Sequence, residues 1–269
     1  MKTTLTLAAA TACAMLLQPT MAQTARPPDA VSGASPARPA GEAAPAPAAA
    51  VAEAARPAAD TDRDALRKPG EMVKFAGIRP GNKVVDFMPG SGYFTRVFSE
   101  AVGPKGVVYA VVPEEMLKRR ATAADGIKAI AAEPAHHNVK VLVQPAGAFA
   151  PPEPVDVVWT SQNYHDVHTA SFGLGNVTDL NKAAFKALKP GGMYVVLDHA
   201  AAPGAGIEES TKLHRIDPAM VKQEVTTAGF VFDGEDSSLR NPADPHTAGV
   251  FDPSVRGKTD QFIYRFRKP

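Results

Sequence analysis

Seven short runs of apolar, β-branched and aromatic residues recur along the chain, at residues 83–88, 107–112, 139–144, 155–161, 193–199, 230–232 and 261–266. The first five are nearly continuous in Val, Leu, Ile, Phe and Tyr, which is typical of strands covered on both faces. Between them, apolar residues recur at helical spacing, as Phe94, Val97, Phe98 and Ala101 do. Strands that alternate with helices predict an α/β fold with a mostly parallel sheet.

The last two runs have no helical pattern between them. We therefore expect these two segments to pair in antiparallel fashion at one edge of the sheet. The stretch that joins them, residues 233–258, is rich in proline, aspartate and glycine. A connection of this length inside a compact domain is usually functional or mobile.

A charged start and a short apolar run mark the N-terminus. Lys2 precedes an apolar stretch from about residue 5 to residue 17, and Pro19 and the small residue Ala22 follow. A stretch of this length is typical of a secretory signal peptide and too short for a membrane anchor. We predict a signal peptide at residues 1–22, a periplasmic or secreted protein, and no stable membrane span after cleavage. A buried first helix and a lipid on Cys13 are the alternatives.

Residues 23–60 consist mainly of alanine, proline, glycine and serine and contain no aromatic residue. Such a segment cannot bury enough apolar surface to offset the entropy of ordering it. We therefore predict a disordered linker here and one domain over residues 61–269. The formal net charge of +1 supplies no basic field for nucleic acid, so the composition argues against a dedicated nucleic-acid binder.

The clearest chemical feature is a strand that runs through Asp86 into a glycine pair, Gly90 and Gly92, and then directly into an amphipathic helix. Glycines let the backbone turn tightly and approach a ligand, and the helix behind them presents free N–H groups. In an open α/β sheet this turn lies where ligands bind. Thr95 stands where a dinucleotide fingerprint has its third glycine, which disfavours NAD and FAD.

Residues 86–95 resemble motif I of the class I S-adenosylmethionine-dependent methyltransferases. Residues 102–110, 187–196 and 228–230 resemble the later strand junctions of that family, in the same order. Residues 163–166, 198–199, 213–217 and 250–253 are similar to a group of predicted bacterial methyltransferases with exported members. The resemblance implies a Rossmann-like, seven-stranded, mostly parallel sheet with an antiparallel edge strand and helices on both faces.

The resemblance also implies S-adenosylmethionine as cofactor, with its methionine part at Gly90 and Gly92. The second strand ends without the usual acidic residue, so Glu114 is the candidate for the ribose hydroxyls. Gln144 closes the third strand and is the candidate for the adenine edge. The predicted cofactor-binding set is completed by Asp86, Ser91 and Asn163.

The fourth predicted strand ends in residues 160–168. The resemblance implies that this segment lies beside the methyl group that is transferred. His165 is a candidate general base whose tautomer would be set by a carboxylate elsewhere in the chain. The neighbouring Asp166 need not be that carboxylate, because adjacent side chains of an extended segment point in opposite directions. Asp166 and His199 complete the predicted catalytic set. Alternatively, His165 and Asp166 only hydrogen-bond the loop backbone.

A metal site built from several histidines and Asp198 is a further alternative. The histidines are His165, His168, His199 and His214. Their spacing matches no standard zinc pattern, and no carboxylate cluster marks a magnesium site, so we predict no metal.

Three functions compete. A methyltransferase acting on a small molecule is the first. An exported, non-catalytic binding protein on the same scaffold is the second, because S-adenosylmethionine is made in the cytoplasm and fold alone does not settle function. A nicotinamide oxidoreductase is the third, and the missing third glycine argues against it.

Overall fold

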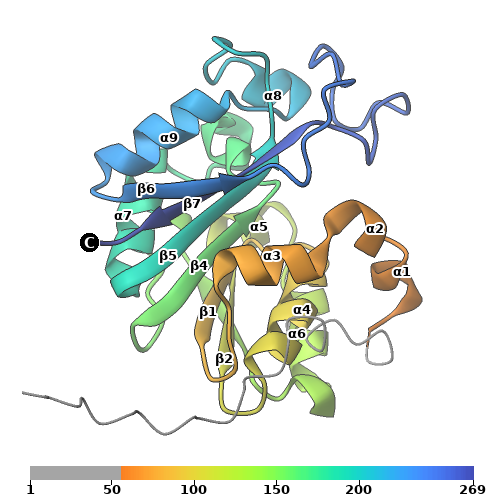
Figure 1. Ribbon diagram of the computed structural model, residues 1–269. Coiled ribbons are helices and arrows are strands. Elements are labelled where there is room, and N and C mark those ends of the chain that lie inside the picture. The colour runs from red at the N-terminus through yellow and green to blue at the C-terminus, as the bar shows by residue number, and fades with distance from the viewer. Residues whose placement is uncertain (1–55) are drawn as a thin grey trace, which may run out of the picture. The chain divides into compact units, whose positions relative to one another are not determined.

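The computed structural model describes residues 56–269, which form a layered α/β domain around one sheet (Figure 1). The sheet contains all seven predicted strands, so the predicted fold class is confirmed. The strands are β1 (Lys83–Phe87), β2 (Val107–Pro113), β3 (Val139–Gln144), β4 (Val155–Ser161), β5 (Leu188–His199), β6 (Val231–Asp236) and β7 (Gln261–Arg267). Their order across the sheet is β3-β2-β1-β4-β5-β7-β6.

The pairing of the strands divides the sheet into two parts. Strands β1 to β5 pair in parallel, as their nearly continuous apolar runs predict. The last strand, β7, is antiparallel to both β5 and β6. The predicted antiparallel pairing of the last two strands is therefore confirmed, and β7 lies between β5 and β6 rather than outside them.

Helices cover both faces of this sheet. The α-helices are α1 (Ala58–Thr61), α2 (Asp64–Arg67), α3 (Pro69–Ala76), α4 (Tyr93–Val102), α5 (Glu114–Arg119), α6 (Asp125–Ala132), α7 (Val177–Ala187), α8 (Glu209–Leu213) and α9 (Pro218–Thr227). Short 3₁₀ turns are η3 (Pro134–His136), η4 (Ala146–Ala148), η5 (His165–His168) and η6 (Ala170–Phe172).

Two apolar cores form because neighbouring strand residues point to opposite faces. Val85 of β1 packs with Leu180 of α7 and Val221 of α9, whereas the adjacent Val84 packs with Val97 of α4 and residues of α3 and α6. The last helix, α9, begins with a side-chain cap. The Asp217 side chain accepts a hydrogen bond from the Ala219 N–H, and Pro218 occupies the first turn.

The folded part begins before the predicted boundary at residue 61. Arg56 and Asp60 are buried, and Arg56 pairs with Asp64 at the start of α2. Ion pairs and ring contacts therefore order a stretch whose composition predicts a linker. The predicted signal peptide, Cys13 and the linker up to residue 55 lie outside the described residues.

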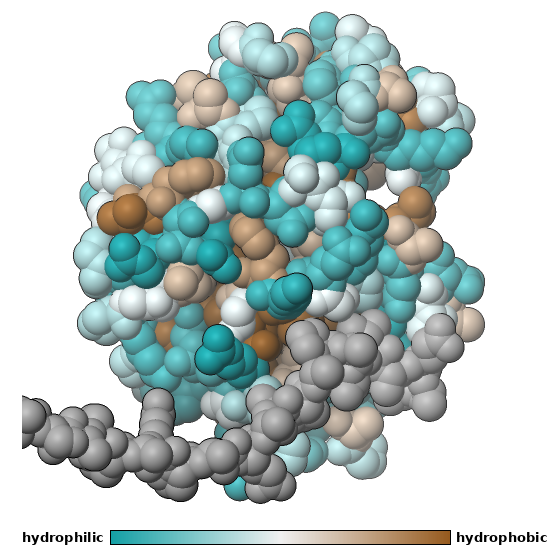
Figure 2. Space-filling view, viewed as in Figure 1, coloured by the Kyte–Doolittle hydropathy of each residue, from teal (hydrophilic) through white to brown (hydrophobic). Residues whose placement is uncertain are grey.

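The exposed surface mixes polar and apolar groups. Figure 2 shows hydrophilic residues surrounding small apolar groups on the face seen in Figure 1. In the described part of the chain, residues 56–269, no helix has the length and hydropathy needed to cross a membrane.

The long connection between β6 and β7 is held at its base by a buried ion pair. The guanidinium of Arg215 is fully buried and donates to both carboxylate oxygens of Asp244, at 2.8 and 3.2 Å. Asp244 also accepts the Asp260 N–H at 2.7 Å. The predicted long loop is thus fastened to the segment that follows α8, while Phe251 near its middle is exposed.

Candidate active site

A cavity of about 260 Å³ lies at the carboxyl ends of β1 and β4, beside the glycine turn. Gly90 has a φ of +58°, and a Cβ built on it meets no atom within 4 Å, so this side of the turn faces open space. Four predicted cofactor residues line the cavity: Asp86, Gly90, Ser91 and Asn163. Of the predicted catalytic residues, Asp166 lines it as well.

Polar groups line this cavity. Within residues 56–269, the buried hydroxyl of Ser161 has no hydrogen-bond partner, whereas Asp166 Oδ1 lies 3.2 Å from His165 Nε2. Asp86 is buried and accepts a hydrogen bond from Thr95 Oγ1 at 2.7 Å. Burial raises the pKa of Asp86 to about 7, although the bond from Thr95 and the charge of Arg67 act in the opposite direction. These groups suit a ligand with donors or positive charge.

Asn163 fastens the loop after β4 to the glycine turn. Its Nδ2 donates to the Met88 carbonyl at 3.0 Å, and its Oδ1 accepts from the Thr160 hydroxyl. Met88 itself has a φ of +53°, which is uncommon for a side chain of this kind. The amide therefore stabilises a strained turn as well as lining the cavity.

Gly92 has a packing role on the other side of the turn and does not line the cavity. Its φ is +82°, and a Cβ on it would lie 2.1 Å from Ile130 Cδ1 of α6. Glycine at this position lets α4 and α6 approach each other closely.

Replacing Gly92 with alanine is expected to lower the free energy of unfolding by about 1–3 kcal/mol, because the new methyl group overpacks the core. Denaturant titration measures the change. Gly81→Ala is the matched control, since Gly81 has a φ of +83° and open space around it. Equal losses in the two variants would contradict a packing role for Gly92.

Glu114 and Gln144 do not reach the cavity. Glu114 is in the first turn of α5, where it pairs with Lys118 at 3.2 Å. Gln144 exchanges two hydrogen bonds with the backbone of Ala150, at 3.1 and 2.8 Å. Both residues lie at the expected strand ends, but their side chains have local partners. Their assignments to ribose and adenine stay predictions.

Arg67 is a site residue that the sequence patterns do not single out. It lies in the short helix α2, upstream of the first strand, and its guanidinium is 4.8 Å from the centre of the Tyr93 ring. It donates to Gln162 Oε1 at 3.0 Å. Among residues 56–269, no ion pair involves Arg67. The only signal in the sequence is the charged run in which it lies.

Arg67 and Gln162 also line a second cavity, of about 300 Å³. The long loop contributes Phe251 and Arg256 to its wall, and His199 contributes its imidazole. The two cavities are therefore neighbours that share two polar side chains. The predicted functional role of the long loop thus has a structural basis.

His165 is held by the buried carboxylate of Asp198 at the end of β5. Its Nδ1 lies 2.9 Å from Asp198 Oδ1, and its N–H donates to Asp198 Oδ2 at 2.8 Å. Asp198 is thus a carboxylate that can set the tautomer of His165 from elsewhere in the chain. Burial lowers the pKa of His165, but the charge of Asp198 and hydrogen bonds to Asp166 and Asp198 outweigh it and raise the pKa to about 10.

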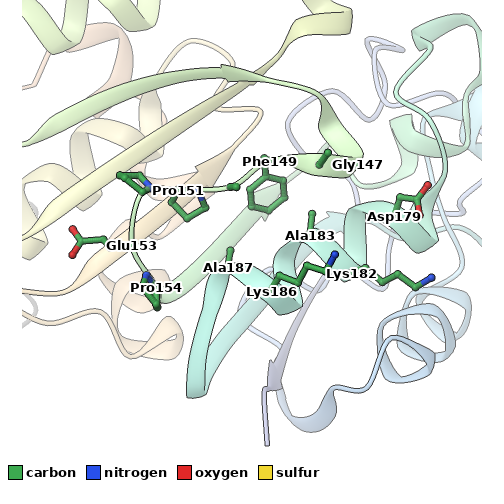
Figure 3. A pocket seen from close by; sticks show the side chains of 13 residues that line it. Gly147, Phe149, Pro151, Glu153, Pro154, Asp179, Lys182, Ala183, Lys186 and Ala187 are labelled. Carbon is green, nitrogen blue, oxygen red and sulfur yellow. The ribbon is translucent and has the colours of Figure 1, made fainter.

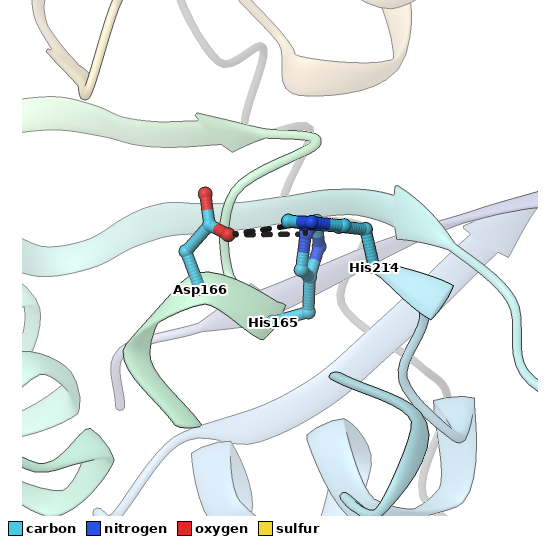
Figure 4. Close-up of side chains that lie close together, drawn as sticks. All are labelled: His165, Asp166 and His214. Atoms are coloured by element: carbon cyan, nitrogen blue, oxygen red, sulfur yellow. Dashed lines mark hydrogen bonds and ion pairs between the residues drawn. The ribbon is translucent and has the colours of Figure 1, made fainter. Parts of the chain in front are cut away.

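Two further side chains meet the outer nitrogen of His165, as Figure 4 shows. Asp166 Oδ1 lies 3.2 Å from His165 Nε2. These neighbours meet because the loop is the 3₁₀ turn η5 and not an extended segment. His214, at the C-terminal end of α8, places its Nδ1 3.2 Å from His165 Nε2 and 3.6 Å from Asp166 Oδ1.

His199 belongs to the second cavity instead of this cluster. Its Nδ1 lies 2.8 Å from Thr259 Oγ1, and its ring centre is 6.3 Å from that of His165. Burial lowers the pKa of His199 to about 4. Asp166 and His199 therefore line two adjoining cavities, whereas the buried His165 lines neither of them.

A larger cavity of about 450 Å³ lies elsewhere, between η4, the segment that follows it, and α7 (Figure 3). Its wall includes Phe149, Lys182 and Lys186. None of the predicted site residues lines it. We therefore place the candidate site at the glycine turn.

The family model of the ubiE/COQ5 methyltransferases matches residues 64–214, more than half of the chain. The chain belongs to the ubiE/COQ5 methyltransferase family. The matched range contains the glycine turn, η5 and His214. The resemblance to class I methyltransferases is therefore confirmed, and S-adenosylmethionine is the cofactor that this membership supports.

Two relatives are named ubiquinone/menaquinone biosynthesis C-methyltransferase UbiE. Those of Ectopseudomonas mendocina and Hydrogenovibrio crunogenus are 37% and 35% identical over 130 residues, which is 47% of this chain and 45% of each relative. The chain thus spans about half the length of the curated relatives it matches. A solved SAM-dependent methyltransferase from Aquifex aeolicus has a TM-score of 0.50 and 19% identity, covering 77% of this chain and 99% of that one.

The residues present fit the methionine part of S-adenosylmethionine better than its ribose and adenine. The open side of Gly90 and the hydroxyl of Ser161, which has no hydrogen-bond partner among residues 56–269, form a cradle for a polar ligand. The side chains of Glu114 and Gln144 are engaged elsewhere. The fit is therefore good at the glycine turn.

Proposed function

We propose that this chain transfers a methyl group from S-adenosylmethionine to a small acceptor that carries a negative charge. The observation that supports this most is the pair of adjoining cavities, which share Arg67 and Gln162. One cavity contains the glycine turn of the family, and the other supplies a separate space for an acceptor. Holding two reactants in line in this way accounts for much of the rate in such reactions.

When bound, S-adenosylmethionine supplies an electrophilic methyl group on a positively charged sulfur. The backbone at Gly90 approaches the ligand without a side chain in the way, and the carboxylate of Asp86 lies at the cavity wall. Asn163 keeps the loop after β4 against the turn, so the two walls of the cavity hold a fixed separation.

The charge of the second cavity supports an anionic acceptor. Arg67, Arg63 and Arg256 line it, and Phe251 and Leu66 add apolar surface. Arg63 is paired with Asp60, but Arg67 forms no ion pair among residues 56–269 and donates to the neutral amide of Gln162. A half-buried cation of this kind favours a carboxylate or phosphate on the incoming molecule.

The relatives' names refer to quinone biosynthesis, but the second cavity of this chain is formed in part by residues outside the family match. The family match ends at His214, whereas Phe251 and Arg256 come from the long loop beyond it. The acceptor is thus recognised in part by residues outside the matched range. We propose an acceptor class from the charge of the cavity alone.

Calorimetric titration of the full chain with S-adenosylmethionine tests the proposal. We expect binding of one molecule per chain, and His165→Ala is expected to retain that binding while losing turnover, because the imidazole lies outside the glycine cavity wall. No heat at millimolar cofactor would contradict the methyltransferase function. Full turnover in His165→Ala would contradict its catalytic assignment.

A non-catalytic binding protein on this scaffold is the second candidate. It is supported by the local partners of Gln144 and Glu114, which engage the two side chains predicted to hold the adenine and the ribose. The same titration separates the two candidates. Absence of cofactor binding would support the binding protein.

We also propose that the protein is periplasmic or secreted. The charged start, the short apolar run and Ala22 support cleavage of residues 1–22. Cell fractionation tests this placement. An intact N-terminus in the cytoplasmic fraction would contradict it.

A further inference from the structure

We propose that His165, His214 and Asp166 form a binding site for a divalent transition metal of the zinc type. The ligand atoms are His165 Nε2, His214 Nδ1 and Asp166 Oδ1, which converge on one point in Figure 4. The site lies at the wall of the glycine cavity, which Asp166 lines. It does not depend on the proposed methyl transfer.

The spacing of the three atoms matches metal coordination. Their separations are 3.2, 3.2 and 3.6 Å. At zinc-ligand bonds of roughly 2.0–2.1 Å, a tetrahedral ion separates its ligands by about 3.3–3.4 Å. The three atoms lie on a circle of about 1.9 Å radius, so an ion at ordinary bond lengths sits just outside their plane.

The hydrogen bonds of Asp198 orient the imidazole of His165 toward the cluster. Asp198 engages His165 at Nδ1, which leaves Nε2 to face the shared point. A carboxylate behind a ligating histidine is the usual outer support of a metal site, because it fixes the ring and increases its basicity. Asp166 Oδ1 is buried and lies 3.2 and 3.6 Å from the two imidazole nitrogens, so all three ligand atoms face the same point.

The ligand types decide the class of ion. Two imidazole nitrogens and one carboxylate oxygen suit zinc, cobalt and iron, whereas magnesium and calcium prefer oxygen ligands throughout. Three protein ligands leave at least one coordination position open. Because Asp166 also lines the cavity, that position is available to a ligand oxygen.

The sequence gives little sign of this site, because its ligands come from two distant segments. His165 and Asp166 are adjacent, and His214 follows only after β5 and the whole of α8. No short spacing pattern contains them. The fold brings them together at the carboxyl end of the sheet.

Titration of the chelator-stripped full chain with Co²⁺ tests the site. Cobalt in a near-tetrahedral site of this kind absorbs in the visible range, so binding has a spectroscopic signature independent of turnover and of S-adenosylmethionine. We expect one equivalent to bind, with Zn²⁺ displacing it. Failure of the wild-type chain to bind a stoichiometric equivalent would overturn the proposal.

His214→Asn is the decisive variant. His214 has a φ of +55°, and asparagine tolerates this backbone region, so the turn is preserved while the imidazole is lost. We expect the affinity for Co²⁺ to fall by at least about 100-fold, the upper range for loss of an outer-sphere partner. The matched control is His137→Asn at an exposed histidine, which should bind as the wild type does.

Asp166→Asn is a second variant in case His214→Asn does not fold. It retains the shape of the side chain and removes its charge, and we expect the same loss of cobalt absorption. Wild-type affinity in a folded His214→Asn or Asp166→Asn chain would overturn the proposal. Equal weakening in His137→Asn would do so as well.

Discussion

Replacing Gly90 with valine is expected to weaken S-adenosylmethionine binding at least about 100-fold while the chain stays folded. The new side chain would occupy the open side of the turn, where the structure has no other atom within 4 Å. The positive φ of +58° adds backbone strain of about 1–2 kcal/mol, which most domains tolerate. Calorimetric titration measures the affinity, and thermal unfolding confirms the fold.

Gly173→Val is the matched control for this experiment. Gly173 has a φ of +66° and the same open surroundings, but it does not line the glycine cavity. We expect a similar loss of stability and unchanged cofactor affinity. If Gly90→Val binds S-adenosylmethionine as the wild type does, the cofactor is not held at this turn.

Replacing Arg215 with methionine is expected to cost about 3–5 kcal/mol of unfolding free energy. The change leaves the fully buried carboxylate of Asp244 without its countercharge, and such orphaned charges are strongly destabilising. It also removes donors from the carbonyls of Ala200 and Ala248. Denaturant unfolding measures the loss, and Lys118→Met, which breaks an exposed pair, should cost well under 1 kcal/mol.

The loss caused by Arg215→Met should shrink in acid. Burial opposes ionisation of Asp244, but the Asp260 N–H and the Arg215 guanidinium hold its pKa below the usual carboxyl range. A lowered pKa contributes stability that is present at neutral pH and is lost as the pH falls through that lowered value. The unfolding free energies of the wild type and of Arg215→Met should therefore converge as the pH falls through the pKa of Asp244. A difference between them that stays constant from neutral pH down to that pKa would contradict a stabilising role for the Arg215–Asp244 pair.

The sheet was predictable from sequence because each strand carries its own local signal. Runs such as Val155–Ser161 are apolar on both faces, and the glycine turn follows the first of them. The position of β7 between β5 and β6 has no local signal, since it depends on pairing across the whole sheet. The same holds for the start of the domain, where Arg56 is buried through a contact with Asp64.

The candidate site was predictable where polar, reactive side chains directly follow a strand in the sequence. His165, Asp166 and Asp198 each lie at or just after the end of a strand, and the structure brings them together. Arg67 and His214 come from short helices whose position is set by tertiary packing. Glu114 and Gln144 show where such a prediction fails to place a side chain. Both residues lie at the expected strand ends, but their side chains bind nearby groups of the protein instead of facing the cavity.

The place of β7 in the sheet has a consequence for the order in which the chain can fold. Of the seven strands, β7 is the last to leave the ribosome, yet β6 has no other partner through which to join the sheet. Until residues 261–267 have been made, β5 keeps an open edge and the late half of the domain cannot close. Contacts of such long sequence separation form slowly. A chain that has to be exported before it folds would gain time from that delay, and we propose export for this one.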